Sequence, residues 1–342
     1  MLNRRILRIK AFKTLYSYAE NPSMDLKEAR KQLEVSCEAT RDLYLLMMAL
    51  IPALTAEAFS RIESARNKFN PTDEEKFPNM KFASNALASN LQADEEFRKL
   101  LSRKKLSWDQ YDVFLRQLYE NVRQRDYFKA YMDAPGNSLK EDAALFTKVF
   151  ERELVDDASL EAILEDMSIY WNDDLAYSLT GCCRSLDQIC STGRWIYPEL
   201  FLSDMNGASG AKMSDSQFVY GLLETAVAGY PRYFQMISEC VPQWDKDRLF
   251  TTDVCLIALG LAEQQKFGSS IDVRITINEY VEISKYYSTR KSSSFVNSLL
   301  DKLLKEQLNK NEESSLFNDC SGRHGLNLCF LRQQRQQWRQ QR

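Results

Sequence analysis

The sequence predicts an all-α protein. Along most of its 342 residues, apolar side chains recur at spacings of three and four, which is the period of an amphipathic helix. Only 11 glycines and 8 prolines interrupt this pattern, and alternating polar and apolar runs are few. With 44% hydrophobic residues, the chain can bury the core of one large domain or of two ordinary ones.

The same spacing predicts where each helix lies. We expect helices at residues 2–19, 24–68, 83–102, 107–132, 138–155, 158–190, 214–228, 230–242, 250–265, 273–287 and 292–308. The second should break around Pro52, because proline removes a backbone donor and clashes with the preceding turn. Prolines and glycines mark the connections at Pro71, Pro78, Pro135-Gly136, 193–198 and 207–210.

Residues 271–277 allow two interpretations. Isoleucine and valine alternate there with polar residues, as in a half-buried strand. The residues that follow, from Ile277 through Tyr280 and Val281 to Ser284, have helical spacing instead. Because an all-α neighbourhood offers no partner strand, we predict a helix.

Composition favours a reduced, cytoplasmic protein. The eight cysteines form no CxxC pair, and Cys182 and Cys183 are adjacent. The longest apolar run, near Leu43–Leu54, contains Pro52 and is shorter than the roughly eighteen residues that a membrane span needs. The N-terminus has basic residues but no apolar signal-peptide core. We therefore expect no contact with a membrane.

The residues for catalysis are also missing from the sequence. Its one histidine, His324, lies in the tail, so a Ser-His-Asp or Cys-His arrangement or a histidine metal site is not expected in the folded part. No glycine-rich phosphate loop is present. We predict a protein that is not an enzyme, with no catalytic residues, no metal and no cofactor.

The first predicted helix concentrates positive charge. Before the first acid, Glu20, it carries Arg4, Arg5, Arg8, Lys10 and Lys13. Its apolar residues predict a buried face made of Leu2, Ile6, Ile9, Phe12, Tyr16 and Ala19. Guanidinium groups beside that face can bind phosphate and stack on bases, although a solvated helix flank would show the same pattern.

Three segments resemble the NusB transcription antitermination family. Residues 4–8, Arg-Arg-Ile-Leu-Arg, followed by Leu-Tyr-Ser at 15–17, are similar to the arginine-rich opening helix of that family. Residues 244–263, from a Trp through Arg-Leu to a Glu, resemble its middle helices. The Ile-Asn-Glu of 277–279 and the later Asn297 resemble its last two helices, with Asn297 beside the buried face. The resemblance points to RNA binding.

The resemblance also assigns roles to individual residues. The RNA-binding residues that it implies are Arg4, Arg5 and Arg8. Arg290 and Lys291 depart from the family, in which this loop is often acidic, and their charge makes the loop a candidate second contact for RNA phosphate. The implied partner-binding residues are Tyr16 and Asp253, which would contact NusE, a small-subunit ribosomal protein. With NusE, the protein would bind boxA-type single-stranded RNA in ribosomal RNA transcripts and act on the transcription elongation complex.

The chain is long for this family, so we expect a central insertion. The predicted organisation is NusB-like helices at 1–70, an inserted helical region at 71–200, a NusB-like bundle at 201–310 and a disordered or atypical tail at 311–342. Residues 142–178 echo 215–252, as a duplicated hairpin or chance similarity among amphipathic helices would.

Two other functions remain open. A helical scaffold that binds only protein would fit the net charge of −3 and the sparse arginines. An RNA-binding appendage related to ribosomal RNA cytosine methyltransferases would need a cofactor domain with a glycine-rich turn, for which the sequence has no motif. The Arg-Gln-Gln repeats of 332–342 suggest a basic arm that touches RNA, or a segment unrelated to function.

Overall fold

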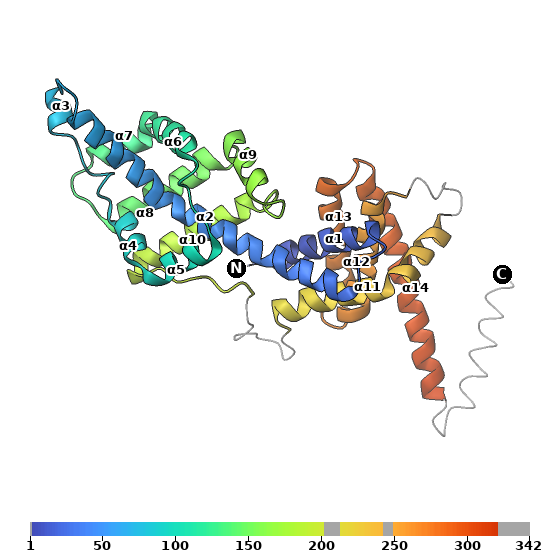
Figure 1. The fold of residues 1–342 in the computed structure, drawn as a ribbon. Coiled ribbons are helices and arrows are strands. Elements are labelled where there is room, and N and C mark those ends of the chain that lie inside the picture. Colours follow the sequence, from blue (N-terminus) through green and yellow to red (C-terminus); the bar gives the residue numbers. More distant parts are fainter. Residues whose placement is uncertain (1, 202–212, 242–248, 321–342) are drawn as a thin grey trace. The chain divides into compact units, whose positions relative to one another are not determined.

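The fold is built from α-helices (Figure 1). The computed structural model describes residues 2–201, 213–241 and 249–320, with side chains as far as residue 306 in the last helix. Every regular element within these ranges is helical. The predicted all-α class is confirmed.

The chain divides into two compact units. Unit 1 comprises Met1–Leu2 and Glu34–Leu202, and unit 2 comprises Asn3–Leu33 and Ser203–Arg342. The boundary falls inside α2 (Leu26–Arg66), whose first turns belong to unit 2. The predicted ranges 1–70, 71–200, 201–310 and 311–342 concern family relationship rather than compactness, and they remain predictions.

Unit 2 is organised around α12 (Thr251–Phe267). Its side chains are buried without interruption from Asp253 to Glu263, as expected of a helix enclosed on all sides. The helices that pack against it are α1 (Arg4–Glu20), α11 (Asp215–Cys240), α13 (Val273–Tyr287) and α14 (Ser292–Cys320) (Figure 1). Gly260 permits close packing, because a Cβ atom there would lie 2.7 Å from Leu300 and 3.3 Å from Tyr280.

Unit 1 packs shorter helices against the rest of α2, which is buried without interruption from Leu43 to Ile51. These helices are α3 (Asp73–Lys76), α4 (Ala86–Ala93), α5 (Glu95–Lys104), α6 (Asp112–Gln124), α7 (Asp126–Asp133), α8 (Leu139–Val149), the π-helix η1 (Phe150–Leu154), α9 (Ala158–Met167) and α10 (Leu175–Thr192). Buried Asp142 links three of them, since it accepts hydrogen bonds from the Ala86 amide at 2.7 Å and from the Tyr131 hydroxyl at 2.6 Å. A buried carboxylate needs such donors.

Several predicted helix boundaries need correction. The expected break at Pro52 does not occur, and α11 likewise continues through Pro231, so tertiary packing outweighs the cost of one proline in each helix. Conversely, the predicted helices 83–102, 107–132 and 158–190 are each divided in two. The first division is at Asp94, whose side chain accepts from the Phe97 amide at 2.9 Å and starts α5.

The contested segment is helical, as predicted. Asp272 precedes α13, and its carboxylate accepts a hydrogen bond from the Arg274 amide at 2.8 Å. This cap starts the helix three residues before Thr276, which is fully buried. The alternating pattern thus comes from the first turn of a helix, and Ile275 in that turn is exposed.

One described helix, α2, is long and apolar enough to cross a membrane on length and composition alone. Within its most apolar window, 67% of the residues are buried inside the fold. The apolar run is therefore explained by its place in the core of unit 1.

Candidate nucleic-acid interface

The buried face of α1 differs from the predicted one. The side chains that face the core are Leu7, Arg8, Lys10, Ala11, Phe12, Thr14 and Leu15. Tyr16, which we had placed on the buried face, is exposed. The prediction is right for Leu2 and Phe12 but misplaces the rest of the stripe, which runs through Leu7, Ala11 and Leu15. It also leaves out Arg8 and Lys10, which are buried although charged.

Arg8 lies in the core of unit 2 and pairs with Glu263 on α12. Its Nε and Nη2 atoms donate to the two carboxylate oxygens at 2.8 and 2.7 Å. Thr276 and Tyr280 on α13 donate their hydroxyls to the same carboxylate at 3.0 and 2.9 Å. Burial alone would lower the pKa of Arg8, but the hydrogen bonds with Glu263 raise it, so Arg8 stays charged in the core. In this structure the Arg8 guanidinium therefore faces Glu263 and joins three helices.

Arg5 is the most exposed of the three arginines, with 49% of its side chain accessible. Its Nε and Nη2 atoms donate to both carboxylate oxygens of Glu279 on α13, at 2.9 and 2.7 Å. These hydrogen bonds from Arg5 lower the pKa of Glu279. Glu279 also lies 3.7 Å from Nη1 of Arg8, so it stands between the two guanidinium groups.

Arg4 is partly exposed and points toward α11. Its Nε donates to Asp215 Oδ1 at 2.6 Å, and its Nη2 donates to the Met213 carbonyl at 2.9 Å. The guanidinium carbon lies 4.4 Å from the centre of the Phe218 ring, within cation–π range. Arg4 is thus held on two sides while 33% of its side chain remains accessible.

The three arginines line one hollow of about 540 Å³, which we call the arginine cavity. The described residues that line it are Asn3, Arg4, Arg5, Arg8, Ser270, Ile271, Ile275 and Glu279. Glu279 is the one acid among them, and Ile275 adds an exposed apolar side chain. Guanidinium groups beside an exposed apolar surface suit a ligand that combines phosphate with a flat base.

Comparison with known proteins identifies the family. Residues 197–305 match the family model described as "NusB family". The transcription antitermination protein NusB of Natranaerobius thermophilus is 36% identical over 95 residues, which cover 27% of this chain and 67% of that protein. The chain belongs to the NusB family.

Two further NusB proteins show how far the similarity extends. That of Methylacidiphilum infernorum is 42% identical over 72 residues, which cover 21% of this chain and 50% of that protein. That of a Nitratiruptor species is 28% identical over 119 residues, which cover 34% of this chain and 84% of that protein. The chain thus spans only half of the first relative, and residues 1–196, including α1, precede the segment that matches the family model. No solved structure matches the chain.

Arg290 and Lys291 lie in the loop that follows α13 in this NusB-family chain. Both are exposed, and among the described residues neither has a carboxylate within ion-pair distance. Buried Asp253 holds the loop, because it accepts hydrogen bonds from the hydroxyls of Ser288 at 2.7 Å and Ser292 at 2.9 Å. Asp253, predicted to contact a partner, is therefore turned toward these serines, whereas Tyr16 is accessible.

Contacts between α1 and α13 connect the two basic regions. Arg5 meets Glu279 near one end, and the Phe12 ring lies 5.4 Å from that of Tyr287 near the other. The ammonium of Lys13 lies 5.6 Å from the same Tyr287 ring. The two helices therefore run in the same direction, so cationic side chains lead from Arg5 past Lys13 toward the loop of Arg290 and Lys291.

The sequence analysis missed the set of groups that positions these arginines. Glu263 ends one motif of the NusB resemblance, and Thr276 and Tyr280 flank another, but nothing in their spacing shows that Thr276, Tyr280 and Arg8 all bind the Glu263 carboxylate. Asn297, expected beside the buried face, is exposed. Of the Trp244–Glu263 motif, residues 244–248 lie outside the described residues.

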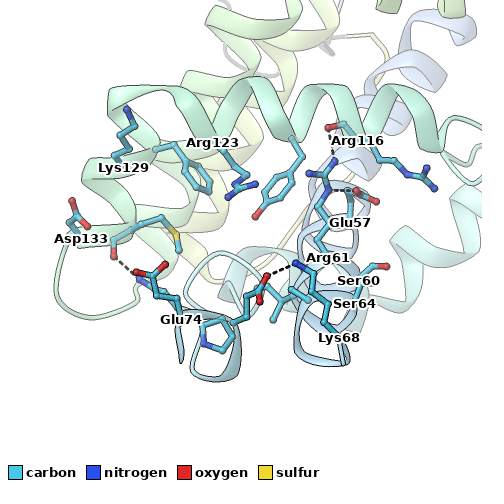
Figure 2. Close-up of a pocket in the computed structure, with 18 residues that line it drawn as sticks. Glu57, Ser60, Arg61, Ser64, Lys68, Glu74, Arg116, Arg123, Lys129 and Asp133 are labelled. Carbon is cyan, nitrogen blue, oxygen red and sulfur yellow. Dashed lines mark hydrogen bonds and ion pairs between the residues drawn. The ribbon is translucent and has the colours of Figure 1, made fainter. Parts of the chain in front are cut away.

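Unit 1 contains a second hollow rich in cations, of about 970 Å³, which we call the α2–α6 cleft. Figure 2 shows Arg61 on α2, Lys68 just after the end of that helix, and Arg116 and Arg123 on α6 around this space. The cations that line it are Arg61, Lys68, Arg116, Arg123 and Lys129, and the acids are Glu57, Glu74, Glu75 and Asp133. Positive and negative charges are thus nearly balanced on its walls.

Proposed function

We propose that this chain is a non-enzymatic transcription antitermination factor that binds boxA-type single-stranded RNA together with NusE in the cytoplasm. The observation that carries the proposal is the arginine cavity in a chain of the NusB family, since three arginines line it, two of them partly accessible, beside one acid among the described lining residues. The names of the relatives support antitermination as the process.

In the proposed complex, Arg5 and Arg4 contact RNA phosphate directly. Both side chains are partly accessible and retain N–H groups that their carboxylate partners do not use. Arg8 acts through its ion pair with Glu263, which keeps α1 seated against α12 and α13. Arg290 and Lys291 provide a second contact with the same strand beyond the far end of α13.

Sequence preference in this proposal comes largely from the partner. Phosphate contacts give affinity but carry no sequence information, so base recognition needs further surface. Tyr16 is exposed on α1 and is the residue that we propose for contact with NusE. Asp253 contributes indirectly, because its hydrogen bonds to Ser288 and Ser292 shape the loop that presents the basic pair.

Binding of a fluorescent single-stranded ribosomal leader RNA tests this function, measured by anisotropy across a salt series with and without NusE. We expect affinity that increases with NusE and falls with salt, with a slope of about 0.7 in log–log form for each phosphate contacted. A shuffled RNA of the same composition serves as the control. Equal affinity for both RNAs in the presence of NusE, or no salt dependence, would contradict the proposal.

A protein-only scaffold is the second candidate, and one observation favours it. Each arginine of the cavity already has a carboxylate partner: Asp215 for Arg4, Glu279 for Arg5 and Glu263 for Arg8. If these pairs persist, the cavity attracts anions weakly. NusE binding without any RNA binding would select this alternative.

A further inference from the structure

Glu279 has an unusual position for a residue beside a proposed RNA site. It is the one acid among the described residues that line the arginine cavity, and only 16% of its side chain is accessible. Its two carboxylate oxygens accept hydrogen bonds from Nε and Nη2 of Arg5, and Oε2 also lies 3.7 Å from Nη1 of Arg8. The edge of the Arg5 guanidinium that binds an anion best, formed by Nε and Nη2, is therefore already occupied by Glu279.

A phosphate group and a carboxylate use the same edge of a guanidinium group. Each offers two oxygens at a spacing that matches the paired N–H groups of arginine. An RNA phosphate that approaches Arg5 must either displace Glu279 or bind to the N–H groups that Glu279 leaves free, where the geometry is less favourable. In both cases the negative charge of Glu279 repels the phosphate. Arg8 cannot compensate, because Glu263 holds it in the core.

We propose that Glu279 restrains the affinity of the arginine cavity for RNA by competing with phosphate for the Arg5 guanidinium. This inference rests on the proposed function and deepens it. It distinguishes Glu279 from Glu263: Glu263 is fully buried, binds Arg8 and holds the helices together, whereas Glu279 binds the arginine that faces solvent. Release of Arg5 from Glu279 is then a step of RNA binding.

The alternative role for Glu279 predicts the opposite effect of a substitution. If the carboxylate only orients Arg5 toward RNA, its removal should weaken binding, because Arg5 would lose a fixed direction. If it competes, Glu279→Gln should strengthen RNA binding by about three- to tenfold and make the salt dependence steeper by about 0.7, since one more phosphate contact forms.

The matched control is Glu282→Gln on the same helix. It removes the same charge, but Glu282 pairs with Lys285 at 2.5 Å and does not line the cavity. We expect Glu282→Gln to change RNA affinity by less than about twofold, because an exposed pair of this kind contributes little. Equal gains in both variants would mean that net charge is responsible, and the inference would be overturned.

A double variant shows whether Glu279 acts through Arg5. In full-length protein that carries Arg5→Ala, the gain in RNA affinity from Glu279→Gln should disappear, since the guanidinium for which Glu279 and phosphate compete is absent. A gain that persists, or weaker binding by Glu279→Gln alone, overturns the inference while RNA binding by the unmodified protein still supports the proposed function. If no variant binds the leader RNA, the proposed function itself fails, and this inference fails with it.

Discussion

The arginine cavity of unit 2 and the α2–α6 cleft of unit 1 both collect cations, but they place their acids differently. In the cavity, Asp215 and Glu263 pair with Arg4 and Arg8 without lining the hollow, so Glu279 is the one acid among the described residues that line it. In the cleft, the acids stand on the same walls as the cations. We therefore expect the position of the counter-charge, more than the number of cations, to decide which hollow attracts an anion.

In the α2–α6 cleft, each lining cation has a carboxylate partner that offsets its charge. Arg61 pairs with Glu57 at 2.6 Å and also with Glu120, and Lys68 pairs with Glu75. Arg116 pairs with Asp112 at 2.7 Å. Arg123 and Lys129 have weaker partners, at 3.4 and 3.8 Å, but Glu74 and Asp133 line the same space. A polyanion gains little from such a surface.

The buried pair behind the cavity should give the largest effect. Arg8→Ala leaves the Glu263 carboxylate buried without its ion partner, and we expect a loss of about 3–5 kcal/mol in the free energy of unfolding of unit 2. Because two units need not unfold together, amide hydrogen exchange of α12 is the appropriate measurement.

The variant Arg8→Met with Glu263→Gln controls for this loss. It removes both charges and keeps an oxygen that can accept from Thr276 and Tyr280, so it should recover much of the stability. A cost below about 1 kcal/mol for Arg8→Ala alone would show that the pair does not hold α1, and Arg8 would again be free for direct contact with RNA.

Asp253 should give the next largest effect. Asp253→Ala removes the acceptor shared by the Ser288 and Ser292 hydroxyls and should cost about 1–3 kcal/mol. Hydrogen exchange at the start of α14 should increase, and RNA affinity should fall because Arg290 and Lys291 are no longer held in place. Unchanged exchange in residues 288–292 would contradict this positioning role and return Asp253 to direct partner contact.

Arg5 is the sharpest test of the cavity itself. Arg5→Ala removes an accessible cation without disturbing a buried pair, so the fold should be retained. We expect RNA affinity to fall by about three- to tenfold and the salt dependence to become shallower by about 0.7. Anisotropy with the leader RNA measures both quantities. A drop in affinity with an unchanged salt slope would mean that Arg5 does not meet phosphate.

The sequence was informative where periodicity determines structure and uninformative where partners are distant. Helical spacing from Ile277 onward and the lack of a partner strand were sufficient to predict α13, even though residues 271–277 alternate. The same reasoning misplaced part of the buried face of α1. It could not foresee that Arg8 is buried, because its partner Glu263 lies 255 residues later in the chain. Resemblance selected Arg4, Arg5 and Arg8 as a group, but only the structure separates the enclosed arginine from the two accessible ones.

The smallest effect is expected in the α2–α6 cleft, and it decides whether the comparison holds. The double substitution Arg123→Ala with Lys129→Ala removes the two lining cations with the weakest ion partners, both of which are exposed. RNA affinity should change by less than about twofold, because the acids of the cleft already offset its positive charge. Measured beside Arg5→Ala at the same salt, this variant loses twice as much charge, so a general effect of net charge would make it the weaker binder. Such a result would show that net charge sets the RNA affinity, and the arrangement of acids would then not be what distinguishes the two hollows.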